Sequence, residues 1–96
     1  MKIAGHWTDI YLTKPESTHQ PFRRAVVSSK ISKKAVVRNL LKRRLRQILK
    51  EVLKKETYLA SLNIAVVAKL GISAASFQEL KKDVIKLFEK IRQSAS

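Results

Sequence analysis

Apolar residues recur every three to four positions through the middle of the chain. Residues 34–56 contain no glycine or proline, and their recurring apolar positions are Val37, Leu41, Leu45, Ile48 and Val52. At about 100° per residue, these side chains cluster within roughly a quarter of a helix circumference. The pattern predicts a long amphipathic helix whose apolar stripe faces the protein core.

A second stripe of the same period lies near the end of the sequence. Its members are Phe77, Leu80, Val84, Leu87, Phe88 and Ile91. Ser76 is followed three residues later by Glu79, which is the spacing of a capping box, although Ser73 could also cap the helix. We therefore predict a closing amphipathic helix that begins after one of these two serines.

Three segments have the character of strands. Residues 6–13 (HWTDIYLT) are rich in aromatic and β-branched side chains and precede a loop that contains two prolines. Residues 62–69 (LNIAVVAK) form a short apolar run before Gly71, which is typical of a buried strand. Residues 22–29 (FRRAVVSS) contain β-branched valines and alternate in polarity.

The alternation in residues 22–29 assigns side chains to two faces of a strand. One face holds Phe22, Arg24 and Val26, and the other holds Arg23, Ala25 and Val27. The simplest pairing is a hairpin with residues 6–13. The resulting order is β-β-α-β-α, which predicts an α+β sandwich with helices packed on a small sheet. With 96 residues, the chain has room for one core, so we expect a single domain over residues 1–96.

Charge changes this picture most. The chain has 21 lysines and arginines against 7 acids, a formal net charge of +14 at pH 7, which indicates a polyanionic partner. No apolar run is long enough to cross a bilayer, and the N-terminus lacks the apolar segment of a signal peptide. The chain has no cysteine, which fits a reducing compartment. We therefore expect a cytoplasmic protein.

The cations are concentrated on the predicted central helix. Eleven of the 21 basic residues lie between Lys30 and Lys55, where Glu51 is the only acid. One arc of the helix, beside the apolar stripe, carries Arg38, Asn39, Lys42, Arg43, Arg46, Lys50 and Lys54. A surface that only keeps the protein soluble would mix acids with bases and so avoid self-repulsion. A helix that lies on a membrane would carry bulky aromatic residues for insertion, and the polar face of this helix has none. Nucleic acid is the favoured partner because its phosphates release counterions when cations bind.

Residues 26–49 (VVSSKISKKAVVRNLLKRRLRQIL) resemble the most characteristic segment of the bacterial ribonuclease P protein subunit family. The helix motif is matched by Arg38, Asn39, Lys42, Arg43 and Arg46. The lead-in is matched by Ser28, Lys30, Lys33, Lys34, Ala35, Val36 and Val37. Residues 66–71 (VVAKLG) are similar to a family strand that ends in Ala-Arg-Pro-Gly.

The sequence also departs from the family pattern. Leu40 stands where the family usually has an arginine, and Ser29 stands where it usually has a lysine. The helical projection places Leu40 outside the apolar stripe, so it is either a surface residue or part of another contact. Family members usually begin with a helix of some twenty residues before the first strand, whereas this sequence starts almost at the predicted first strand, so we expect that helix to be absent.

The resemblance implies a sandwich like the second domain of one small-subunit ribosomal protein, and a subunit of a tRNA 5′-maturation endoribonuclease. Its partners would be the catalytic RNA of ribonuclease P and precursor tRNA, with no membrane and no protein partner implied. The implied RNA-binding residues are Lys30, Lys33, Lys34, Arg38, Asn39, Lys42, Arg43, Arg46 and Lys50. Tyr11 is the implied contact to the single-stranded 5′ leader, and Trp7, expected on the same strand face, is a second stacking candidate.

We expect no catalytic residue and no metal site on the protein, with Mg²⁺ bound by the RNA subunit as the resemblance implies. His6 and His19 lack partners at metal-ligand spacing. Glu79 and Asp83 share a helix face but are surrounded by lysines, which predicts a salt-paired surface and not an acid–base pair.

Two other functions fit a basic helix of this kind. One is a ribosomal or other structural RNA-binding protein of similar fold. The other is a DNA-binding domain that reads the major groove, although no helix-turn-helix pattern is present.

Overall fold

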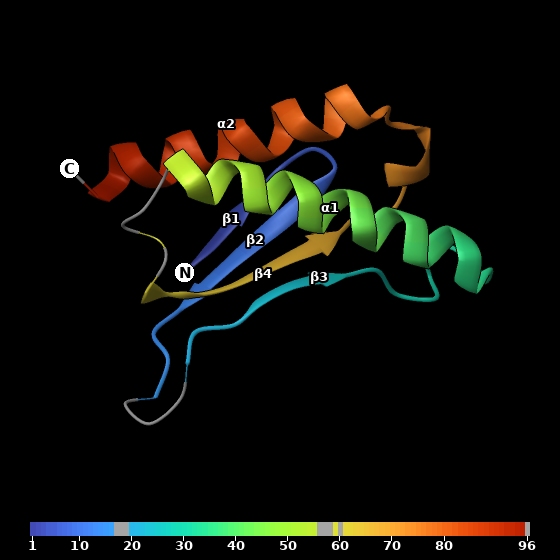
Figure 1. The fold of residues 1–96 in the computed structure, drawn as a ribbon. Coiled ribbons are helices and arrows are strands. Elements are labelled where there is room, and N and C mark those ends of the chain that lie inside the picture. The colour runs from blue at the N-terminus through green and yellow to red at the C-terminus, as the bar shows by residue number, and fades with distance from the viewer. Residues whose placement is uncertain (17–19, 56–58, 60, 96) are drawn as a thin grey trace.

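A four-stranded sheet carries two helices on one face (Figure 1). The computed structural model describes residues 1–16, 20–55, 59 and 61–95. The elements in chain order are β1 (Lys2–Ala4), β2 (Thr8–Thr13), β3 (Arg23–Val26), α1 (Ala35–Lys55), β4 (Asn63–Ala68), the short 3₁₀ helix η2 (Ile72–Ala74) and α2 (Phe77–Ala95). The α+β prediction is confirmed, and none of the helices in the described ranges is long and apolar enough to span a bilayer.

The strand order is β1-β2-β4-β3, so the predicted hairpin between residues 6–13 and 22–29 is wrong. β2 pairs antiparallel with both β1 and β4, whereas β3 pairs with β4 in parallel. β4 is the most apolar strand, and a central position gives its backbone hydrogen-bond partners on both sides. β3 carries two arginines, which suit an exposed edge of the sheet.

β1 is an additional strand that the hydrophobic pattern did not predict. It has three residues, too few for a period to be visible, and it pairs through Lys2 opposite Tyr11 and Ile3 opposite Ile10. The strand predicted from residue 6 begins at Thr8, because His6 and Trp7 form the turn between β1 and β2.

Both predicted helices are present. In α1 the stripe residues Leu41, Leu45, Ile48 and Val52 are buried together with Leu49 and Leu53. Val37, in the first turn of α1, is only partly buried. α2 begins with the predicted capping box: the Glu79 amide donates to Ser76 Oγ at 3.2 Å, and the Ser76 amide donates to Glu79 Oε1 at 3.3 Å. Ser73 lies in η2 instead.

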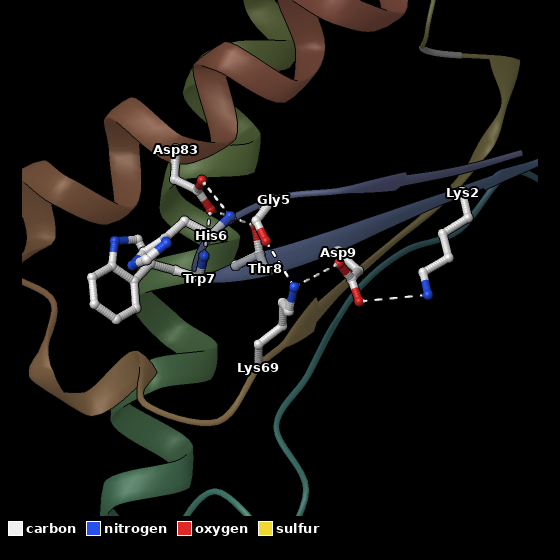
Figure 2. A network of polar contacts seen from close by, with 8 residues as sticks. All are labelled: Lys2, Gly5, His6, Trp7, Thr8, Asp9, Lys69 and Asp83. Atoms are coloured by element: carbon white, nitrogen blue, oxygen red, sulfur yellow. Dashed lines mark hydrogen bonds and ion pairs between the residues drawn. The ribbon is translucent and has the colours of Figure 1, made fainter.

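The β1–β2 turn is attached to α2 by one carboxylate (Figure 2). Asp83 accepts hydrogen bonds from the amides of His6 and Trp7, both at 3.1 Å, and from the Thr8 hydroxyl at 3.0 Å. The expectation that Asp83 is a salt-paired surface residue is therefore wrong. Gly5 passes so close to α2 that a Cβ atom there would lie 2.7 Å from Leu87 Cδ1.

Candidate nucleic-acid interface

The polar face of α1 is a continuous cationic surface. We define this face by Arg38, Asn39, Lys42, Arg43, Arg46 and Lys50, all of which were predicted to bind RNA. Asn39, Arg43, Arg46 and Lys50 are exposed, while Arg38 and Lys42 are half-buried. The face exists because the buried stripe packs against the sheet and α2, which leaves the other side of the helix to solvent.

The segment before α1 adds cations to the same end of the helix. Lys30, Lys33 and Lys34 are exposed, and the first turn of α1 contains no acid. Arg38 Nη1 donates to the Ser32 carbonyl at 2.9 Å, so this arginine also holds the lead-in against the helix. The positive end of the helix dipole therefore lies beside three lysines, an arrangement that favours anions.

The cations of the polar face are not neutralised by the acids that the structure describes. Glu51 pairs with Lys81 of α2 at 3.0 Å, and Asp9 lies 3.8 Å from Lys2 and 3.7 Å from Lys69. Within the described ranges, no carboxylate forms an ion pair with the polar face. Its charge is available to an external anion.

The sheet face opposite the helices carries aromatic residues beside cations. Lys2, Tyr11, Ala65 and Arg24 lie in one row across the four strands, because each is the register partner of the next. The Lys2 ammonium lies 5.6 Å from the centre of the Tyr11 ring, and the Arg24 guanidinium lies 4.3 Å from the centre of the Phe22 ring. Tyr11 is 39% exposed and Phe22 is 38% exposed. Both rings are accessible for stacking.

Trp7 does not share this face, which corrects the expectation from sequence. It precedes β2, lies in the β1–β2 turn and packs against the core cluster as a partly buried residue. Its ring contacts the His6 ring edge to face, with 4.3 Å between centres, near α2 (Figure 2). The turn reverses the chain before strand alternation starts, so counting residues back from Tyr11 assigns Trp7 to the wrong face.

Three residues of the open sheet face were not selected from sequence as site residues. Lys2 was missed because β1 is too short to predict. Phe22 and Arg24 were assigned to one strand face by their alternation, and that signal was correct, but neither was selected as a contact to RNA. The structure places Lys2 opposite Tyr11, and Arg24 opposite Ala65, whose small side chain lies between Tyr11 and Arg24 in the row.

Comparison with known proteins agrees with this arrangement. The family model described as ribonuclease P matches residues 2–92. The ribonuclease P protein component of Streptococcus agalactiae serotype III is 34% identical over 83 residues, which is 86% of this chain and 72% of that protein. The component of Rickettsia prowazekii is 33% identical over 86 residues, covering 88% and 69% of the two chains.

A solved structure has the same fold. The Staphylococcus aureus RNase P protein superposes with a TM-score of 0.69, covering 95% of this chain and 80% of that chain, at 16% sequence identity. The fold similarity, the family match over nearly the whole chain and the basic α1 motif agree. The chain belongs to the ribonuclease P protein family.

Proposed function

We propose that this subunit binds the catalytic RNA of ribonuclease P through the polar face of α1. The observation that carries the proposal is the set of cations on that face, which no described carboxylate pairs. Contacts from lysine and arginine to phosphates position a protein on RNA without reading its sequence, and each releases counterions. The exposed amide of Asn39 adds a hydrogen-bonding group within this cationic surface.

The open sheet face is the proposed site for the single-stranded 5′ leader of precursor tRNA. Tyr11 and Phe22 offer two ring faces, and Lys2 and Arg24 bring positive charge beside them. Stacking on an aromatic ring contributes about 1–3 kcal/mol per base and tolerates any base identity. This chemistry suits a leader whose sequence varies among tRNAs. Trp7, partly buried in the turn, is not part of this site.

In the proposed mechanism, the RNA subunit and its Mg²⁺ ions carry out phosphodiester hydrolysis, and the protein contributes charge and positioning. Four of the described acids have structural contacts that support this assignment: Asp83 holds the turn, Glu79 caps α2, and Asp9 and Glu51 form ion pairs. Cations near two RNA molecules reduce their mutual repulsion, a task otherwise left to free Mg²⁺. The protein should therefore matter most at low magnesium concentration.

A reconstitution experiment tests the proposal. A bacterial ribonuclease P RNA is mixed with the protein, and cleavage of precursor tRNA is followed at low magnesium. We expect cleavage with both components and none with RNA-free protein. Multiple-turnover cleavage by the protein alone would overturn the assignment of chemistry to the RNA. Equal affinity for ribosomal RNA and ribonuclease P RNA would instead favour a general structural RNA-binding protein.

A pair of double variants tests the polar face itself. Lys42→Gln/Arg43→Gln removes two cations from α1, and Lys82→Gln/Lys86→Gln removes the same charge from exposed positions on α2. We expect the first to lower the slope of log affinity against log salt by about 1.4 and the second to leave it nearly unchanged. Identical slopes for the two variants would mean that the polar face is only a solvated surface.

A further inference from the structure

A second cationic groove lies where α1 meets the edge of the sheet. We call it the β3-side groove, and its volume is about 480 Å³. The residues that line it are Arg23, Arg46, Leu49, Lys50, Leu53 and Lys54. Leu49 and Leu53 are 3% and 8% exposed, so they form an apolar floor between four cations. No acid is among the lining residues.

Two elements build the groove from opposite sides. β3 alternates so that Ala25 is buried beneath α1 while Arg24 lies on the open sheet face with Phe22. Arg23, on the same side of the strand as Ala25, therefore points towards the helix side of the edge strand. On α1, Arg46, Lys50 and Lys54 follow each other at four-residue steps and form a line about 12 Å long.

Acids line the groove on the other side of α1, so their absence is particular to the β3-side groove. A groove of about 530 Å³ between α1 and α2 is lined by two acids, Glu51 and Glu89, as well as by cations. Glu51 pairs with Lys81 at 3.0 Å. Lys54, at the outer surface of the helix, borders both grooves. The C-terminal half of α1 thus directs its one described acid to α2, whereas Arg46 and Lys50 line only the β3-side groove.

We propose that the β3-side groove binds a segment of the phosphodiester backbone of the RNA subunit, with phosphates on Arg23, Arg46, Lys50 and Lys54 and a ribose over the two leucines. This inference rests on the proposed function and extends it from the polar face of α1 to the edge of the sheet. Arg46 and Lys50 belong to both surfaces, so the RNA path is continuous. A strand stacked at about 3.4 Å per nucleotide would pass three to four phosphates along the 12 Å line.

Arg23 decides the test because it lies on β3 and not on α1. The affinity of the full-length protein for a bacterial ribonuclease P RNA is measured against salt, without precursor tRNA, for Arg23→Gln and for Arg23→Gln/Lys50→Gln. We expect the slope to fall by about 0.7 for the single variant and about 1.4 for the double. Affinity at about 0.1 M salt should fall roughly threefold and tenfold. Arg23 and Lys50 are both exposed, so we expect each variant to fold, and a melting curve for each variant checks this.

The matched control is Lys55→Gln/Lys86→Gln, which removes two cations from exposed positions outside the groove and should change affinity less than twofold. An Arg23→Gln slope equal to that of the wild type would overturn the inference. So would a loss of affinity seen only with leader-bearing precursor tRNA, since the groove would then contact the substrate. If Lys42→Gln/Arg43→Gln weakens binding while the groove variants do not, the proposed function stands and this inference alone fails.

Discussion

Replacing Asp83 by alanine should destabilise the protein more than any other substitution of an acid on α2. The carboxylate accepts three hydrogen bonds from consecutive residues of the β1–β2 turn, at 3.0 to 3.1 Å (Figure 2). These bonds join residues that are 75 to 77 positions apart in the chain. Their loss would detach the first hairpin from the last helix.

The magnitude follows from the burial of the three donors. The bond from the His6 amide is exposed, and water can replace it at little cost. The Thr8 side chain belongs to a residue that is 0% exposed, and a buried hydroxyl without a partner costs about 1–3 kcal/mol. The half-buried bond from the Trp7 amide to a carboxylate adds about 1 kcal/mol or more. The sum is about 3 kcal/mol, which corresponds to a fall in melting temperature of about 15 °C.

Thermal and urea unfolding followed by circular dichroism measure this change. Asp83→Asn should lose about half as much stability, because the amide keeps one acceptor oxygen and places an NH₂ group against a donor. Glu89→Ala removes the same charge from an exposed position on the same helix and should change stability by less than about 0.5 kcal/mol. A melting temperature for Asp83→Ala within 3 °C of the Glu89→Ala value would refute the reasoning.

Three further substitutions have defined outcomes. Gly5→Ala should lower stability by about 1–3 kcal/mol in urea unfolding, because the new Cβ would lie 2.7 Å from the Thr8 carbonyl oxygen, a backbone atom. Ser76→Ala should cost about 1 kcal/mol in the same assay by removing the cap of α2, and a value near zero would mean that the capping box adds no stability. Leu40→Arg should bind ribonuclease P RNA several-fold more tightly at low salt with an unchanged melting temperature, because Leu40 is 37% exposed and outside the core; weaker RNA binding together with a lower melting temperature would contradict this.

Periodicity in the sequence was sufficient to predict both helices. An amphipathic stripe depends only on residues three and four apart, so Leu41, Leu45 and Ile48 define the buried side of α1 before any partner is known. The same local geometry placed the cations together on the other side of the helix. The Ser76–Glu79 spacing also indicated the capping box of α2, since its two residues are three apart, and the structure decided between Ser76 and Ser73.

The spacing of the basic motif also carried the family relationship. The matching residues lie within one helix and its lead-in, and the family match over residues 2–92 confirms the resemblance. The roles assigned to individual residues of that motif remain predictions, because RNA contacts depend on where the partner lies.

Only the tertiary structure decided which strands are neighbours. Strand propensity describes how a residue fits a pleated surface and contains no information about the pairing partner, so the parallel pairing of β3 with β4 was not foreseen. That pairing places Arg24 and Phe22 on the same sheet face as Tyr11. It places Arg23 beside α1, where the two elements line one groove. The open sheet face and the β3-side groove are therefore products of long-range packing.

The β1–β2 turn illustrates the same limit at a single residue. The sequence identified Trp7 as an aromatic residue and Asp83 as a charged one. The hydrogen bond from the Trp7 amide to Asp83, however, joins positions 76 apart in the chain. Such contacts form because burial of the core brings distant segments together, and their energy depends on distances that no local pattern encodes. Local periodicity determined the two helices and which side of α1 carries the cations. The packing of the sheet decided which strand lies beside those cations.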